Sequence, residues 1–380
     1  MKKIVIAADS FKGSISSQTF ADVCEAAISS VMPDCNVIKI PLGDGGEGTV
    51  DALIDSLHAN RMTVKVCDPL MRPCQAVYGI TPDGTTAIME MAQASGLPML
   101  SECERNPMET STYGTGMMIT DALDRGCSRI MLGIGGSATN DGGIGMLRAL
   151  GAKFYDCDGN LMPYAGSGKD LITICRIDTT GLDPSLSRMR IEVACDVDNP
   201  FCGEKGAARV FARQKGADSA MIESLEAGMV HFASVIKAAT EHDVTTMAGA
   251  GAAGGLGGAL AAVLHARLMP GIEMVLDAVD FEHRIVGADM IITGEGRIDS
   301  QTLMGKTPSG VLKAALRQSV PVVAIGGSVD YSEALCQAGF AGIFSIQSYP
   351  LSLEKALDPT VASRNLYDTV KQIISLITAF

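Results

Sequence analysis

The residues most able to do chemistry in this chain lie in one glycine-rich segment. It reads Gly135-Gly136-Ser137-Ala138-Thr139-Asn140-Asp141-Gly142-Gly143 and directly follows the apolar run 129–134. A strand that ends in glycines exposes backbone N–H groups, and the turn into a following helix aims them at one point. That arrangement suits a phosphate or a carboxylate. A tight strand-to-helix turn without any ligand would have the same composition.

Three other segments repeat this combination of glycine with a carboxylate or a strand end. They are residues 44–48, 249–258 and 293–299. Several such loops in one chain indicate an anionic ligand accompanied by a divalent cation.

Composition limits the classes of protein to which the chain can belong. With 380 residues, of which 47% are hydrophobic, it is long enough for two domains that each bury a core. A formal net charge of −13, without any run of basic residues, argues against a nucleic-acid partner. We therefore expect ordinary α/β domains that bind small molecules.

The cysteines and the N-terminus predict a cytosolic protein. No Cys-x-x-Cys pair occurs among the eleven cysteines, so we expect reduced thiols rather than a metal site or a disulfide framework. The first residues predict a strand rather than a leader, because Asp9 interrupts the apolar run. The uncharged stretch 247–264 is rich in Gly and Ala, which favours a loop and a buried helix over a membrane span.

The elements that must position these loops alternate between strand and helix. Residues 4–7 and 36–42 predict strands, and Ser16 or Ser17 caps a helix that Pro33 stops. This βαβα beginning is typical of a parallel, doubly wound sheet. The C-terminal part has the same style, with strands at 289–293, 321–325 and 342–346 and a last helix from about 361 to the end.

The middle of the chain has a different pattern. Closely spaced strands at 63–66, 76–80 and 86–91 predict an antiparallel region, followed by a strand at 191–195 and helices near 219–240 and 256–268. We infer a second α/β unit inserted into the first. The expected domains are 1–70 plus 285–380, and 71–284.

Six segments together resemble bacterial glycerate kinases of the type 1 family. They are 8–12, 44–49, 133–139, 194–200, 214–217 and 293–299, in the same order and at similar spacing. The resemblance implies transfer of the γ-phosphate of ATP to D-glycerate at the 2-hydroxyl, giving 2-phospho-D-glycerate. It also implies a flavodoxin-like parallel-sheet domain interrupted by a second α/β domain, with the active site in the cleft between them. Ala8, Gly13 and Gly43 depart from the family pattern.

Other functions remain open on the residues alone. No P-loop and no protein-kinase signature occurs, which excludes those classes. A kinase of a related small hydroxy acid, phosphorylation at the 3-hydroxyl, and a nucleotide or sugar-acid sensor are the alternatives. A homodimer is compatible with the sequence.

Asp196 and Asp198 follow the strand predicted at 191–195. Alternation along an extended segment puts both carboxylates on one side, where a metal ion would remove their mutual repulsion. We expect Asp196 to be the base or the residue that orients the hydroxyl, and Asp198 to hold Mg²⁺ together with Asp196, although the two roles could be exchanged. A turn that caps a helix is the structural alternative.

Residues at the first two strand ends are expected to meet the acceptor. Asp9 and Ser10 are candidates for substrate binding, and Lys12 could neutralise a carboxylate or a phosphate as a catalytic cation. Asp44 could hold the hydroxyls of glycerate or a metal ion. Alternatively, Lys12 is an ordinary solvated lysine, and Asp44 only caps the following helix.

The remaining candidates divide between ATP and the acceptor. Gly135, Gly136, Ser137, Thr139 and Asp141 are expected to cradle the phosphates of ATP, with Lys215 as a further cation. Glu295 and Arg297 are expected in a third loop, where the guanidinium could grip the carboxylate of glycerate bidentately. Arg297 could equally be held by its acidic neighbours Glu295 and Asp299, and Lys306 is another cation candidate.

Overall fold

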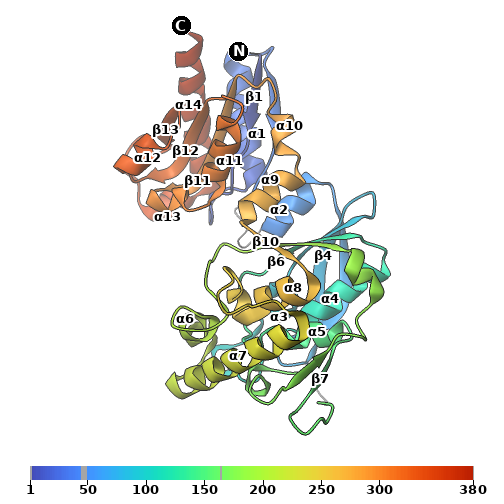
Figure 1. The fold of residues 1–380 in the computed structure, drawn as a ribbon. Coiled ribbons are helices and arrows are strands. Elements are labelled where there is room, and N and C mark those ends of the chain that lie inside the picture. Colours follow the sequence, from blue (N-terminus) through green and yellow to red (C-terminus); the bar gives the residue numbers. More distant parts are fainter. Residues whose placement is uncertain (1, 44–48, 163–164, 380) are drawn as a thin grey trace. The chain divides into compact units, whose positions relative to one another are not determined.

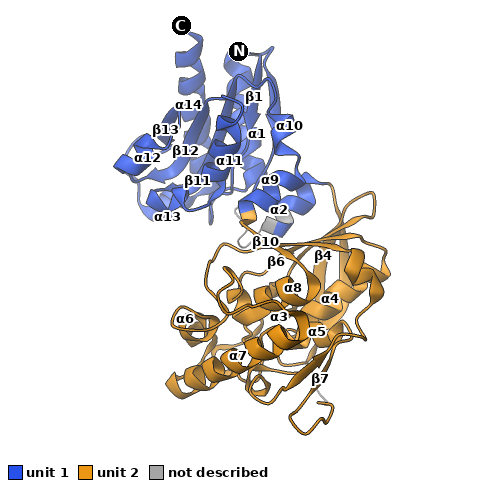
Figure 2. Cartoon of the chain, in the orientation of Figure 1, with its two compact units in different colours: residues 1–57, 272–380 blue, residues 58–271 orange. Residues whose placement is uncertain are grey.

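The computed structural model describes residues 2–43, 49–162 and 165–379. The chain forms two compact units (Figure 2). Unit 1 contains residues 1–57 and 272–380, and unit 2 contains residues 58–271. Both boundaries lie earlier than those expected near 70 and 285. The first does so because β3 (Asn60–Cys67) pairs with β4 (Pro73–Ile80), which ties it to the sheet of unit 2.

Unit 1 is a parallel sheet with helices around it (Figure 1). Its strands are β1 (Lys3–Ile6), β2 (Asn36–Lys39), β11 (Met290–Ile298), β12 (Val322–Val329) and β13 (Gly342–Ser345). Its helices are α1 (Ser17–Val31), α2 (Thr49–Ser56), α9 (Gly271–Ala278, which begins at the unit boundary), α10 (Phe281–Arg284), α11 (Thr307–Leu316), α12 (Glu333–Gln337), α13 (Leu353–Leu357) and α14 (Pro359–Thr378).

The strands of unit 1 follow the order β13-β12-β11-β1-β2, and all neighbours are parallel. This is the doubly wound order of flavodoxin-like folds, so the predicted fold class is confirmed. Strand β2 pairs with one edge of β1, and β11, β12 and β13 follow in order from its other edge. The switch point therefore lies between β1 and β11, where open α/β sheets bind their ligands.

Helix α1 shows how local sequence builds this unit. Of the two predicted cap residues, Ser16 is the N-cap, and its hydroxyl accepts from the Thr19 N–H at 3.1 Å. Phe20, Cys24 and Ile28 recur one turn apart and form its buried face. That face packs with α14 in the same apolar core, which also contains residues of β1, β11 and β12.

Unit 2 contains a mixed sheet in the order β10-β9-β6-β5-β4-β3. Besides β3 and β4, this sheet contains β5 (Thr86–Glu90), β6 (Arg129–Gly133), β9 (Arg190–Ala194) and β10 (Arg267–Met269), while β7 (Lys153–Tyr155) and β8 (Arg176–Asp178) form a separate two-stranded sheet of unit 2. Its helices are α3 (Ala92–Ser95), α4 (Tyr113–Asp124), α5 (Ile144–Ala149), α6 (Ala207–Phe211), α7 (Ser219–Thr240) and α8 (Leu256–Leu264). Strands β3, β4 and β5 are antiparallel, as predicted, whereas β5, β6, β9 and β10 are parallel.

Two element predictions were wrong. The segment 293–299 is not a loop, because β11 runs in register with β12 as far as Ile298. The helix expected at 256–268 ends at Leu264, since His265 has a left-handed backbone (φ 54°) and β10 follows. Among the described residues no helix is both long and apolar enough to cross a membrane.

One pair of cysteines differs from the expectation of reduced thiols. Cys157 and Cys175 form a disulfide, with a Cα–Cα distance of 5.1 Å. They flank the antiparallel pair β7–β8, which brings together two residues that no spacing rule connects. The other cysteines of the chain, all of them in the described part, are free thiols.

Candidate active site

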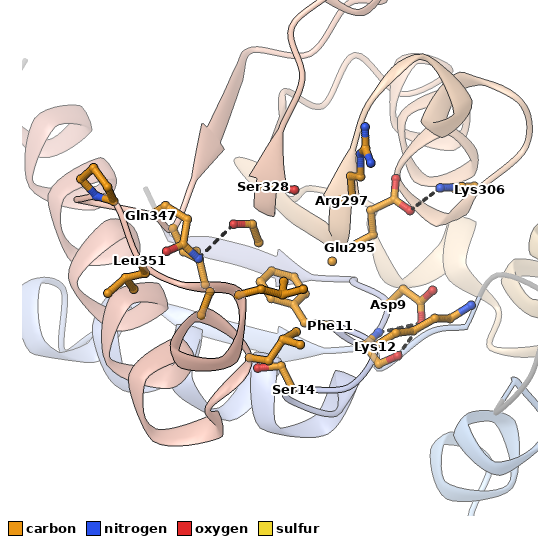
Figure 3. A pocket seen from close by; sticks show the side chains of 18 of the residues that line it. Asp9, Phe11, Lys12, Ser14, Glu295, Arg297, Lys306, Ser328, Gln347 and Leu351 are labelled. Atoms are coloured by element: carbon orange, nitrogen blue, oxygen red, sulfur yellow. Dashed lines mark hydrogen bonds and ion pairs between the residues drawn. The ribbon is translucent and has the colours of Figure 1, made fainter.

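A cavity of about 780 Å³ opens at the carboxyl edge of the unit 1 sheet, at the switch point (Figure 3). It lies where β1, β11, β12 and β13 end, and α13 closes one side. Its lining residues are Asp9, Ser10, Phe11, Lys12, Ser14, Glu295, Gly296, Arg297, Lys306, Gly327, Ser328, Ile346, Gln347, Tyr349, Pro350, Leu351, Leu353, Ala356 and Leu357. The cavity thus brings together all the predicted substrate-binding residues and the predicted catalytic residue Lys12.

Glu295 and Lys306 form an ion pair at the charged end of this cavity (Figure 3). Lys306 Nζ lies 3.3 Å from Glu295 Oε2, and the hydroxyl of Thr302 donates to Glu295 Oε1. Burial raises the pKa of Glu295 above its ordinary value, while Thr302 and Lys306 act in the opposite direction. Glu295 is therefore a fixed carboxyl group that can accept a hydrogen bond from a ligand hydroxyl.

Arg297 lies two residues further along β11, so strand alternation points it to the same side as Glu295. Its Nε is 3.1 Å from Asp299 Oδ2, and an Nη is 3.8 Å from a carboxylate oxygen of Asp330. The ion-pair alternative considered for Arg297 is thus present, with Asp299 rather than Glu295. The Arg297 side chain is 66% exposed, and exposed pairs are weak, so a ligand carboxylate can compete for it.

Asp9 is held rigidly at the end of β1. Its N–H donates to the carbonyl of Gly294 at 2.9 Å, which continues the β1–β11 ladder beyond the strand. Asp9 Oδ1 accepts from the N–H and the hydroxyl of Ser10 at 2.6 and 3.3 Å, and only 7% of Asp9 is exposed. Lys12 is exposed at the same edge. The residues that line the cavity thus include two carboxylates, Asp9 and Glu295, and three cations, Lys12, Arg297 and Lys306.

The cavity floor depends on one glycine. A Cβ at Gly327 would lie 2.6 Å from the carbonyl oxygen of Gly296, closer than real contacts allow. Glycine at this position lets the ends of β11 and β12 approach each other beneath the charged residues.

In unit 2 the predicted glycine-rich loop follows β6. Gly135 and Gly136 are exposed at its tip, and Gly136 has a left-handed backbone (φ 69°) that suits glycine. Lys215 lies beneath them and is only 2% exposed. Its Nζ donates to Ser137 Oγ and to the carbonyl of Thr139, both at 2.7 Å. These hydrogen bonds connect Lys215 to the glycine-rich loop, and both were predicted to bind the phosphates of ATP.

Burial gives Lys215 unusual chemistry. Loss of solvation lowers its pKa to about 7, and the negative charge of Asp141 only partly offsets this. A neutral amine has two N–H donors, which matches the two acceptors found here. The side chain can therefore gain or lose a proton near neutral pH.

Asp141 and Thr139 are completely buried beneath this loop. Asp141 Oδ2 accepts from the N–H and hydroxyl of Thr112 and from the Gly145 N–H, and Oδ1 accepts from the Gly143 N–H. These donors occupy the carboxylate and fasten the loop to α4 and α5. The geometry thus favours a positioning role for Asp141 over the expected direct contact with a nucleotide.

Asp196 and Asp198 leave the end of β9, the neighbour of β6 in the sheet. They therefore share the carboxyl edge of the unit 2 sheet with the loop at Gly135. Asp196 Oδ1 accepts from the Gly271 N–H at 2.8 Å, and both aspartates are exposed.

The oxygen donors of this segment fit Mg²⁺. No group of three or more His, Cys, Asp or Glu residues gathers in the described part of the chain. Mg²⁺ usually needs only one or two protein carboxylates, because water and substrate phosphates complete its shell. Asp196 and Asp198 are two such exposed carboxylates.

Some residues fall outside the predictions. Asp44 lies among residues that the structure does not describe. The sequence analysis missed Ser14, Gln347 and the apolar residues of α13, which line the unit 1 cavity. They carry no charge and belong to no glycine-rich block. Ser14 reaches the cavity from the segment after β1, and Gln347 and α13 reach it because the chain returns past β13.

A flavodoxin-like sheet with a cavity lined by three cations and two carboxylates at its switch point is typical of a protein that binds a small polar ligand. Residues 4–378 match the glycerate kinase family. The chain is 48% identical to a glycerate kinase of Halalkalibacterium halodurans over 94% of both proteins. It is 44% identical to the glycerate 2-kinase of Escherichia coli over 97% of the chain and 95% of that protein.

A solved structure gives the same result. The crystal structure of a protein provisionally named glycerate kinase 2, from Salmonella typhimurium LT2, matches with a TM-score of 0.90 and 44% identity. The match covers 100% of this chain and 98% of that one. The chain belongs to the glycerate kinase family, and it is a kinase that uses ATP.

Proposed function

We propose that this protein is a cytosolic enzyme that transfers the γ-phosphate of ATP to the 2-hydroxyl of D-glycerate. In this step the oxygen of the hydroxyl bonds to phosphorus, the bond to the β–γ bridging oxygen breaks, and the hydroxyl proton leaves. The products are ADP and 2-phospho-D-glycerate. The observation that carries the proposal is the charged end of the unit 1 cavity, where Lys12, Arg297 and Lys306 meet Asp9 and Glu295.

These residues suit a small hydroxy acid. A guanidinium and an ammonium group neutralise the carboxylate of glycerate, so Arg297 and Lys306 are proposed to hold it. The buried carboxyl groups of Asp9 and Glu295 accept from the hydroxyls of glycerate and orient them. Lys12 neutralises developing negative charge on the phosphoryl group.

The unit 2 residues are proposed to handle the phosphates and the metal ion. The tip at Gly135 and Gly136 offers backbone donors to the phosphates, and Lys215 fixes the loop through Ser137. Asp198 and Asp196 would hold Mg²⁺, which neutralises phosphate charge during transfer. Asp196 is also the proposed base, fixed by the Gly271 N–H.

A coupled assay for ADP tests the proposal. With Mg²⁺ and ATP, we expect ADP to form stoichiometrically with added D-glycerate and hardly at all without it. Phosphorus NMR of the product distinguishes the 2-phosphate from the 3-phosphate, and a panel of C3 to C6 hydroxy acids tests the choice of acceptor. Folded protein that shows no glycerate-dependent turnover would refute the proposal.

A further inference from the structure

The unit 1 cavity has a second end whose chemistry glycerate does not use. Tyr349, Leu353 and Leu357 lie on or just before α13 and are 57%, 75% and 38% exposed. All three line the cavity. Large apolar side chains that gather at a pocket rim usually mark a binding surface.

The two ends of the cavity are clearly separated. Figure 3 shows Gln347 and Leu351 at one end and Glu295 and Lys306 at the other, with Phe11 between them. A ligand that fills both ends is apolar at one end and anionic at the other.

A polar atom without a partner lies at the apolar end. Gln347 Nε2 donates to the carbonyl of Gly327 at 3.2 Å, which fixes the orientation of the amide. Gln347 Oε1 is buried, and among the described residues it has no hydrogen-bond partner; the same holds for Ser14 Oγ, which also lines the cavity. Because buried polar atoms are nearly always paired, Gln347 Oε1 is available to a donor on a ligand.

The volume leaves room for a ligand much larger than a three-carbon acid. About 780 Å³ lies within the range of roughly 300–1,000 Å³ typical of pockets for drug-sized ligands. A ligand that fills this cavity would be larger than glycerate and would have an apolar part, an N–H donor for Gln347 Oε1 and negative charge at its far end.

We propose that the apolar end of this cavity binds the adenine of ATP. The amino group of adenine donates to Gln347 Oε1, and the ring lies against Leu353 and Leu357 of α13. The phosphate chain extends from there toward Lys12, the residue proposed to neutralise charge on the phosphoryl group. This inference rests on the proposed function, because it takes ATP as the phosphate donor.

Photolabelling of the full chain with 8-azido-ATP locates the base directly. We expect the label on peptides that contain residues 346–357, with protection by unlabelled ATP. Label confined to peptides of unit 2 would overturn the proposal.

Two substitutions give independent readouts. Leu353→Asp is expected to raise the Kd of ADP about tenfold, because it places a charge where the base packs. Leu376→Asp is the matched control, since Leu376 is also exposed (61%) and lies on α14, outside the cavity. Equal ADP affinity in both variants contradicts the proposal.

Gln347→Leu tests the recognition of the amino group. ITP carries an oxygen where ATP carries this amino group, so the native enzyme should prefer ATP over ITP by at least about tenfold in kcat/KM. Gln347→Leu should remove most of this preference, because it weakens the binding of ATP and lowers kcat/KM for ATP. An unchanged preference would show that Gln347 does not contact the base.

These outcomes separate the two proposals. If glycerate gives no turnover but Leu353→Asp weakens ADP binding, the acceptor assignment fails and the adenine site stands. If glycerate is phosphorylated normally while ADP binding is unaffected by Leu353→Asp, the adenine site fails and the proposed function stands.

Discussion

Lys215 Nζ lies 2.7 Å from Ser137 Oγ, although 78 residues separate them in the chain. This buried amine supports the exposed tip at Gly135 and Gly136 from below. Its pKa of about 7, against an ordinary value of 10.5, means that the folded protein prefers the neutral amine. The free energy of unfolding is therefore linked to pH through this one residue.

The sign of this linkage predicts stabilisation at alkaline pH. Between about pH 7 and 10.5 the unfolded chain binds a proton on Lys215 that the folded chain does not, so the contribution of Lys215 to stability rises with pH. Its slope is at most about 1.4 kcal/mol per pH unit. Thermal unfolding of the native protein and of Lys215→Met across this window should show the native protein gaining stability relative to the variant. Lys153→Met, at an exposed position of β7, should show no such trend.

Asp141→Asn should destabilise unit 2. The variant would turn one oxygen into an N–H donor that faces the N–H groups of Thr112, Gly143 or Gly145. We expect a loss of about 2–4 kcal/mol, because buried donors would lose their acceptor. Urea unfolding measures the loss, and faster hydrogen exchange at the amides of Thr112 and Gly145 locates it. Asp158→Asn, on an exposed turn, is the control, and equal stability of the two variants would show that Asp141 does not hold the loop.

Arg297→Lys tests carboxylate recognition. A lysine keeps the charge but loses the planar pair of donors, so the KM for D-glycerate should rise by about tenfold or more with little change in the KM for ATP. Arg317→Lys is a matched control, because Arg317 also pairs with a carboxylate and is similarly exposed (61%, against 66% for Arg297). If both variants bind glycerate equally well, Arg297 serves only its ion pairs.

Asp196→Asn and Asp198→Asn distinguish the base from the metal ligand. Asp196→Asn preserves an acceptor for the Gly271 N–H, so folding should be unaffected while kcat falls by about a hundredfold or more. Asp198→Asn should instead raise the Mg²⁺ concentration needed for half-maximal activity. The reverse result would exchange the two roles, and Asp124→Asn, at an exposed position on α4, should change neither quantity.

Much of the fold could be predicted from local patterns. The cap at Ser16, the antiparallel strands of residues 60–90 and the helix 219–240 follow from periodicity and turn residues over short stretches. The extent of β11 could not be predicted in this way. Glycines at 294 and 296 and charges at 295 and 297 have the composition of a loop, and pairing with β12 on one side and with the end of β1 on the other keeps this segment extended.

The site could be predicted only where its residues have a local signal in the sequence. Asp9 and Arg297 stood out because charged residues next to strand ends are visible in sequence. The burial of Asp141 and of Lys215 was not visible, because it depends on side chains from distant segments such as Thr112. Gln347 carried no signal at all, since a single amide has no distinctive spacing.

The register of β1 with β11 pairs Ile4 with Met290 and has a consequence for biosynthesis. After the ribosome releases the first strands, residues 58–271 must be made before the neighbouring strand exists. At ~5–20 residues per second this takes roughly ten to forty seconds. Throughout that time the apolar strand Lys3–Ile6 lacks one of its two partners, so one edge of the growing sheet stays unpaired until β11 has been made.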